Sequence, residues 1–122
     1  MSILEIPLTP DTPDFRQVAS LDGAAYVLDV SFSDRTNSWY VSVLQQREDS
    51  EPTPIAEGVR LAVNYPVLAG IVFDGRPQGE LIPIDLTNRG IDPSYEDLGT
   101  RVRLYYYDAS EMARIVAEGV DG

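Results

Sequence analysis

Hydrophobic and polar residues alternate with a period of two along much of the chain, which is the pattern of half-buried β-strands. The clearest case is segment 24–32, where one face carries Tyr26, Leu28, Val30 and Phe32 and the other carries Asp29 and Ser31. Segment 15–21 precedes it across Asp22-Gly23, a two-residue turn signal, so the two segments predict a β-hairpin. Segment 39–44 alternates beyond the polar loop 34–37 and predicts a second hairpin.

Further strands follow the same pattern but with weaker boundaries. Segments 55–63, 79–86 and 101–108 alternate and are predicted as strands, and Thr87 to Thr100 is predicted as a loop with one helical turn at 94–98. Segment 67–73 is a short apolar run that fits either a strand or a buried helix, so it stays undecided. Prolines at 7, 10 and 13 exclude a helix at the start of the chain and predict an extended arm or edge strand.

The period changes after the last predicted strand. Asp108 is placed to cap a helix with Glu111 three residues later, and Met112, Ile115 and Val116 share one helical face before Gly119. The sequence therefore predicts a single, mainly β domain over 1–122, a small antiparallel barrel or sandwich of about six to seven strands with a short C-terminal helix. Its parts are an extended N-terminal arm or edge strand at 1–14, a β body at 15–108 and a helix at 109–119.

Composition narrows the possible functions. The chain contains no His, Cys or Lys, so the usual general base, thiol nucleophile, thiolate metal ligand and Schiff-base amine are missing. Twenty acidic residues against nine arginines give a net charge of −11, which disfavours binding to nucleic acid or to anionic membranes. No signal peptide or membrane-spanning segment is encoded, so we expect synthesis in the cytosol and no membrane insertion.

Five groups of residues are candidate functional sites. The acidic clusters Glu48, Asp49 and Glu51 and Asp92, Glu96 and Asp97 lack the spacing of a calcium loop, so we interpret both as solvated loops and predict neither a metal nor a cofactor. Arg101 and Arg103 lie two apart on one strand face, where they could grip an anion but more simply pair with surface acids. Tyr105 and Tyr107 are compatible either with an interface or with burial. Trp39 is interpreted as core rather than as a ligand-stacking residue.

Four motifs, taken in order, resemble one known family. They are Ile-Leu-Glu-Ile-Pro-Leu-Thr-Pro-Asp-Thr-Pro-Asp-Phe at 3–15, Leu-Asp-Gly at 21–23, Trp-Tyr at 39–40 and Asp-Leu-Gly-Thr-Arg-Val-Arg-Leu at 97–104. Over about residues 3 to 107 the chain resembles the small baseplate plug proteins of contractile-tailed phages, known from a cyanophage baseplate. Members of that family often stop soon after the last strand, whereas this chain continues through the predicted helix.

The resemblance implies a structural virion protein at the centre of a tail baseplate, present in multiple copies and contacting hub, tail tube or spike subunits. The predicted contact residues are Ile6, Pro7, Leu8, Pro10, Phe15, Arg101, Arg103, Tyr105 and Tyr107. The alternative is a small β-barrel that binds a peptide or glycan through Trp39 and the tyrosine run. A carboxylate hydrolase ranks last, because no pair of acids is placed to converge in a cleft.

Overall fold

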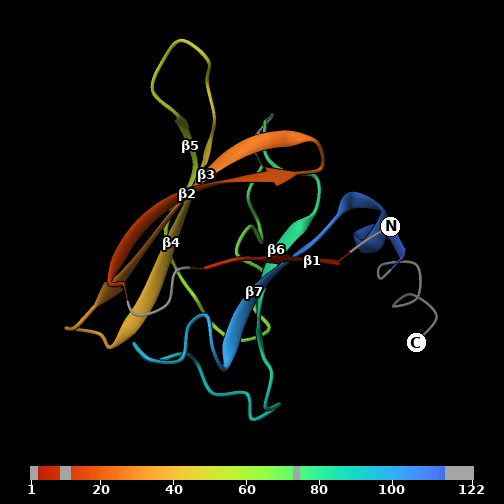
Figure 1. The fold of residues 1–122 in the computed structure, drawn as a ribbon. Coiled ribbons are helices and arrows are strands. Elements are labelled where there is room, and N and C mark those ends of the chain that lie inside the picture. The colour runs from red at the N-terminus through yellow and green to blue at the C-terminus, as the bar shows by residue number, and fades with distance from the viewer. Residues whose placement is uncertain (1–2, 9–11, 73–74, 115–122) are drawn as a thin grey trace.

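The computed structural model describes residues 3–8, 12–72 and 75–114, and in it the chain forms seven strands in two antiparallel sheets (Figure 1). The strands are β1 (Ile3–Ile6), β2 (Asp14–Leu21), β3 (Ala24–Ser33), β4 (Ser38–Gln45), β5 (Thr53–Arg60), β6 (Glu80–Asp85) and β7 (Val102–Tyr107). The larger sheet has the order β2-β3-β4-β5 and the smaller one the order β1-β7-β6. The predicted fold class is confirmed, and the N-terminal residues 3–6 are an edge strand.

Three successive hairpins build the larger sheet. The first turns at Asp22-Gly23, where both residues have positive φ (51° and 82°), the backbone that a two-residue hairpin loop requires and that Asp-Gly readily adopts. The second turns at the predicted polar loop 34–37, where Asn37 also has a positive φ of 52°. Both sequence-predicted hairpins are therefore confirmed.

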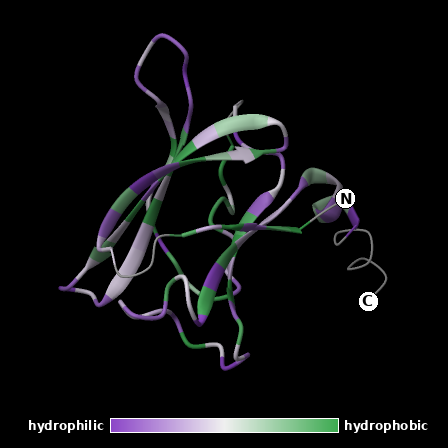
Figure 2. Ribbon diagram, in the orientation of Figure 1, coloured by the Kyte–Doolittle hydropathy of each residue, from purple (hydrophilic) through white to green (hydrophobic). Residues whose placement is uncertain are grey.

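The third hairpin joins β4 to β5 and projects from the body, with a hydrophilic tip (Figures 1 and 2). The register between β4 and β5 shifts after Val41, and Gly58, at φ 60°, donates its N–H to the Ser42 hydroxyl at 2.9 Å. β5 ends at Arg60 rather than at Val63 as expected. Leu61 donates one more bond to the Trp39 carbonyl (2.8 Å) before the chain leaves this sheet.

Segment 61–67 then crosses to the smaller sheet and covers the outer edge of β6. Asn64 N–H donates to the Pro83 carbonyl and Val67 N–H to the Leu81 carbonyl, both at 2.8 Å. Pro83 is tolerated inside β6 because its backbone faces this crossing segment rather than β7. The undecided segment 67–73 is neither strand nor helix in its described part; it is a turn at 67–70, with Val67 and Leu68 buried.

The core lies between the two sheets and is built from the inward faces that alternation predicted. Tyr26, Leu28, Val30 and Trp39 come from the larger sheet, and Leu81, Val102, Leu104 and Tyr106 come from the smaller one; all are at most 4% exposed. Each such apolar side chain contributes about 1.5–3 kcal/mol through burial. The predicted core position of Trp39 is confirmed.

A helix begins at residue 109, directly after β7, and is described as far as residue 114. Asp108 caps it as predicted, since its Oδ1 accepts the Glu111 N–H at 2.8 Å. Glu111 itself pairs with Arg114. The remainder of the predicted helix, including Ile115 and Val116, lies outside the described residues. Within the described part, none of the helical structure has the length and apolar character needed to cross a membrane.

Candidate assembly interface

The outward face of the smaller sheet carries an apolar and aromatic surface that is separate from the core. The register aligns Ile3 with Tyr107, Glu5 with Tyr105, Tyr105 with Ile82, and Arg103 with Ile84 across the three strands. Tyr105, Tyr107, Ile82 and Ile84 are half-buried, and none belongs to or packs on the hydrophobic core cluster. We call this set, Ile3, Ile82, Ile84, Tyr105 and Tyr107, the outer face.

Alternation along β7 explains the split between its three tyrosines. Tyr106 points into the core and is 2% exposed, whereas Tyr105 and Tyr107 point outward. One charged pair crosses the outer face: Arg103 Nη1 lies 3.5 Å from Glu5 Oε2, and both side chains are about 40% exposed (40% and 43%). An exposed pair of this kind contributes little stability, so it leaves both groups available to a partner.

The arm residues occupy several environments. Ile6 is 2% exposed and belongs to the core, while Leu8 packs partly against that core and Pro7 is exposed. Phe15 packs edge-on to Trp39, with ring centroids 6.5 Å apart. Pro10 lies outside the described residues. A partner can therefore reach Pro7 directly, but it reaches Ile6 only if the sheet opens.

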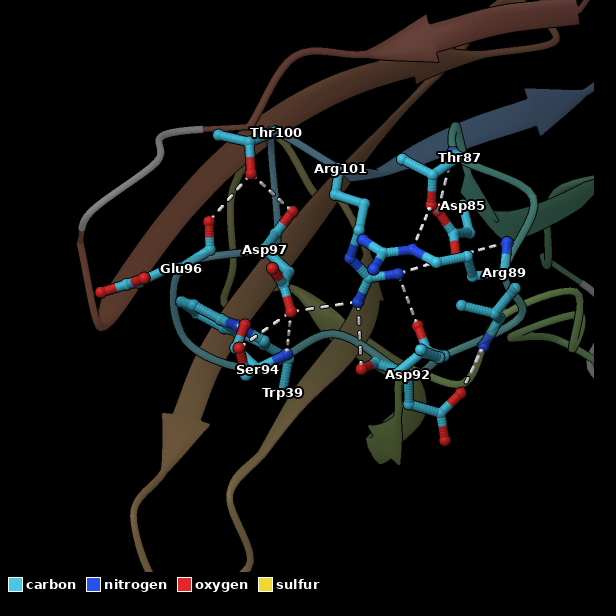
Figure 3. A network of polar contacts seen from close by, with 12 residues as sticks. Trp39, Asp85, Thr87, Arg89, Asp92, Ser94, Glu96, Asp97, Thr100 and Arg101 are labelled. Carbon is cyan, nitrogen blue, oxygen red and sulfur yellow. Dashed lines mark hydrogen bonds and ion pairs between the residues drawn. The ribbon is translucent and has the colours of Figure 1, made fainter.

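Arg101 fixes the loop between β6 and β7 from within (Figure 3). Its guanidinium donates to Asp85 at 2.7 Å and to Asp97 at 3.0 Å, and also to the carbonyls of Ile91 and Asp92. Its side chain is only 11% exposed. The sequence prediction that Arg101 pairs with acids of the chain is confirmed, and the two acids come from the strand end and the loop.

The same network sets the ionisation of both acids. Arg101 and Ser94 donate to Asp97, and these hydrogen bonds, led by that from Arg101, lower the pKa of Asp97 to about 2 despite partial burial. Burial alone would raise the pKa of Asp85, but hydrogen bonds from Thr87 and the charge of Arg101 outweigh it and hold that pKa well below its ordinary value. Both carboxylates therefore stay charged at neutral pH and hold the loop.

The structure therefore corrects the interpretation of the second acidic cluster as a solvated loop. Asp92 and Asp97 are not simply solvated: Asp92 accepts the Val63 N–H at 2.9 Å and pairs with Arg60 at 3.2 Å, while Asp97 binds Arg101. The partner of Asp92, Arg60, is distant in sequence, whereas Arg101 lies only four residues from Asp97. Glu48, Asp49 and Glu51 are exposed in the projecting hairpin, as expected. Among the described residues, no group of three or more acids is arranged to hold a metal ion.

A second polar contact joins the sheets at the β2–β3 turn. The Tyr106 hydroxyl donates to Asp22 Oδ2 at 2.5 Å and accepts the Gly79 N–H at 2.8 Å. Asp22 Oδ2 also accepts the Ala109 N–H at 3.1 Å, which ties the start of the helix to the same carboxylate. Burial, followed by the hydrogen bond to Asp22, raises the pKa of Tyr106 above its ordinary value. The sequence signalled Asp22 only as a turn residue.

Trp39 is held by aromatic neighbours and by one hydrogen bond. Its ring stacks on Tyr95 (centroids 5.7 Å apart, planes 11° from parallel) and meets Phe32 edge-on, while its Nε1–H donates to the Ser94 carbonyl at 2.9 Å. The side chain is 1% exposed. Trp39 therefore offers no stacking surface to a peptide or glycan. This burial argues against the alternative of a binding module, which relied on Trp39 to contact its ligand.

Of the predicted contact residues, the structure brings Arg103, Tyr105 and Tyr107 together on the outer face. Ile6 and Phe15 contribute to the core and Arg101 to the loop network, so their place in an interface stays a prediction. Ile82 and Ile84 were not predicted as contact residues. Alternation along segment 80–85 places them on the opposite face from buried Leu81, and this pattern could have identified them.

Comparisons with known proteins bear on the assembly to which this surface belongs. Residues 3–109 match the protein-family model described as "Cyanophage baseplate Pam3 plug gp18", and this range includes all seven strands. A search of curated proteins found no match. The matched range covers far more than half of the chain and ends where the C-terminal helix begins. The chain therefore belongs to the family of the cyanophage baseplate plug gp18.

Proposed function

We propose that this protein is a structural part of the tail baseplate, a central plug that works through protein–protein contacts with hub, tail tube or spike subunits. The observation that carries the proposal is the family match over residues 3–109, which spans the whole two-sheet body. The protein would be made in the host cytoplasm and be present in several copies in the mature virion. It belongs to a baseplate family, so a location in the tail follows directly from its membership.

The outer face is the surface that we propose for these contacts. Tyrosine is enriched among the residues that dominate binding energies, because it combines a large apolar area with a polar tip and few rotatable bonds. Tyr105 and Tyr107 lie side by side with two isoleucines on a sheet face that the core does not use. The Glu5–Arg103 pair at this face supplies one charge of each sign for orienting a partner.

We propose no catalytic activity. The chain has no His, Cys or Lys. In its densest polar network the charged side chains are paired with one another, with Arg101 between Asp85 and Asp97. Every deeply buried polar side-chain atom of the described residues has a hydrogen-bond partner. These features support a rigid, fully satisfied scaffold.

Substitution of Tyr105 tests the proposed surface. Tyr105→Lys should keep the fold, because the residue faces away from the core, but should lower the amount of the protein in purified tails. Ser50→Lys is the matched control, since Ser50 is exposed in the β4–β5 hairpin, which belongs to the larger sheet. Thermal unfolding of each purified variant and mass spectrometry of tails give the two readouts. Equal incorporation of both variants would exclude the outer face as the contact surface.

A further inference from the structure

The strand β2 has a free backbone edge. Phe32 N–H donates to the Pro13 carbonyl, which makes the pair of residues 13 and 32 a hydrogen-bonded pair of the β2–β3 ladder. Such pairs recur at every second residue, so Gln17 and Ala19 also bond to β3. The N–H and C=O groups of Val18 and Ser20 therefore point away from β3, and no further strand of the described chain pairs with them.

The strand β1 has the complementary free edge. Leu86 N–H donates to the Arg101 carbonyl, so residues 101, 103, 105 and 107 direct their backbones to β6 and the even-numbered residues of β7 direct theirs to β1. Leu4 and Ile6 consequently bond to β7, while the backbones of Ile3, Glu5 and Pro7 face outward. The Pro7 carbonyl confirms this direction, because it accepts a hydrogen bond from Gln17 Nε2 of β2 at 2.7 Å.

The two free edges border one groove, which we call the seam. It is lined by residues 4–7 of β1 and 17–20 of β2. The Gln17–Pro7 bond crosses it at one end, and the contact of Tyr106 with Asp22 ties β7 to the β2–β3 turn. On the opposite side of the molecule, segment 61–67 joins the sheets, so the seam is where the wall of the barrel stays open.

The side chains at the seam are incompletely covered. Leu4 and Ile6 lie on the same inward face of β1, yet Leu4 is 50% exposed and Ile6 only 2%. Val18, on the outward face of β2, is 61% exposed. An inward-facing leucine that remains half exposed beside two unpaired strand edges is the arrangement that strand addition completes, because an added strand supplies both backbone partners and apolar cover.

We propose that the seam receives an extended, basic segment of a neighbouring baseplate subunit, which adds as a strand to the free edge of β1 or β2. This inference rests on the proposed structural role and names the chemistry of the partner. Side chains on one face of the segment cover Leu4 and those on its other face lie beside Val18, and lysine or arginine residues flank them.

Charge selects this partner over a second copy of the chain. The protein carries a net charge of −11, so two copies repel each other at close range. At the seam itself, Glu5 is only loosely paired with Arg103 at 3.5 Å, whereas the cation of β2, Arg16, is fully engaged by Asp29 through two bonds of 2.6 and 2.8 Å. Because these charged side chains are paired with each other, the net charge of −11 of the whole chain decides, and a basic segment gains attraction that an acidic one lacks.

The absence of cysteine permits a direct test in assembled tails. A Val18→Cys variant places one thiol at the seam, and Val72→Cys places one at a residue that is 98% exposed, as the matched control. Maleimide labelling rates are compared between the free protein and purified tails. A benzophenone maleimide on each thiol then identifies the neighbouring segment by photo-cross-linking and mass spectrometry.

The proposal predicts that Val18→Cys is labelled at least about tenfold more slowly in tails than in the free protein, because the seam is occupied there, and that Val72→Cys reacts at similar rates in both. The cross-linked peptide should come from another subunit and carry a net positive charge. Equal labelling in tails, or a cross-link to a second copy, to residues 115–122 of the same chain or to an acidic segment, overturns the seam proposal. Absence of the protein from tails instead overturns the structural role.

Discussion

The Tyr106 hydroxyl donates a 2.5 Å hydrogen bond to the carboxylate of Asp22, which joins the last strand of the smaller sheet to the first hairpin of the larger one. The two residues are 84 positions apart in the sequence. The same carboxylate accepts the first N–H of the C-terminal helix, from Ala109. One acidic turn residue therefore couples both sheets and the helix.

Tyr106→Phe tests this coupling. The change keeps the ring in the core but leaves Asp22 with only the Ala109 N–H as donor and the Gly79 N–H without its acceptor, so we expect the free energy of unfolding to fall by about 1–3 kcal/mol. Tyr107→Phe, on the outer face, should change it by less than about 0.5 kcal/mol. Urea denaturation measures both variants. Equal stabilities of the two would show that the contact does not hold the sheets together.

Alkaline pH should act through the same hydroxyl. Burial and the Asp22 hydrogen bond raise the pKa of Tyr106 above its ordinary value of 10.0, so the folded state holds this proton more tightly than the unfolded state. The resulting stabilisation is fully present below the unfolded pKa and is lost as the pH rises toward the folded one. Wild-type protein should therefore lose stability above about pH 10 more steeply than Tyr106→Phe. Parallel alkaline limbs in the two proteins contradict the assignment.

Acid should weaken the loop network. The pKa of Asp97 is lowered from 3.8 to about 2, chiefly by its hydrogen bond from Arg101, so its contribution is present above the unfolded pKa and is lost as the pH falls through the folded one. Thermal unfolding of the wild type should show a falling Tm between pH 4 and pH 2. Asp97→Asn should have a lower Tm at neutral pH and a flatter decline. Asp34→Asn, in an exposed loop, serves as the control and should follow the wild type.

Trp39 is the single tryptophan and reports directly on the core. Because its side chain is 1% exposed and stacks on Tyr95, we expect blue-shifted fluorescence that acrylamide quenches poorly until the protein unfolds. Peptides and oligosaccharides should leave this emission unchanged. A saturable shift upon addition of a glycan would instead favour the binding-module alternative.

The direction of the backbone groups along β2 predicts that proline lowers stability by different amounts at neighbouring residues. Ser20→Pro removes an N–H that faces the free edge and should cost less than about 1 kcal/mol of stability. Ala19→Pro removes an N–H that bonds to β3 and should cost about 1–3 kcal/mol or more. Chemical denaturation of both variants measures the difference. A larger loss for Ser20→Pro means that the edge is assigned to the wrong set of residues.

Period-two alternation was sufficient to predict the strands, the first two hairpins and the core position of Trp39, because those features depend on neighbours in sequence. The cap of the C-terminal helix was predictable for the same reason, since Asp108 and Glu111 are three residues apart. The end of β5 was not, because alternation continues to Val63 although the chain leaves β4 after Leu61 and bonds to β6 from Asn64.

Contacts between residues that are distant in the sequence could not be predicted from its local patterns. Arg101 and Arg103 looked equivalent as alternating strand residues, yet one is locked between Asp85 and Asp97 and the other remains on the outer face. Asp97 is only four residues from Arg101, but the contact with Asp85 depends on how the loop after β6 folds back, and local spacing does not encode that. The seam likewise exists only because the two sheets meet on one side and stay apart on the other.

Electron microscopy of the intact tail is the most direct test of the central claim. Our account predicts density at the centre of the baseplate that fits the two-sheet body of residues 3–109, with its outer face or seam against a neighbouring subunit. Mass spectrometry of the same tails should detect the protein. Tails that are complete and infectious but show no such density, and contain none of this protein, would contradict the account.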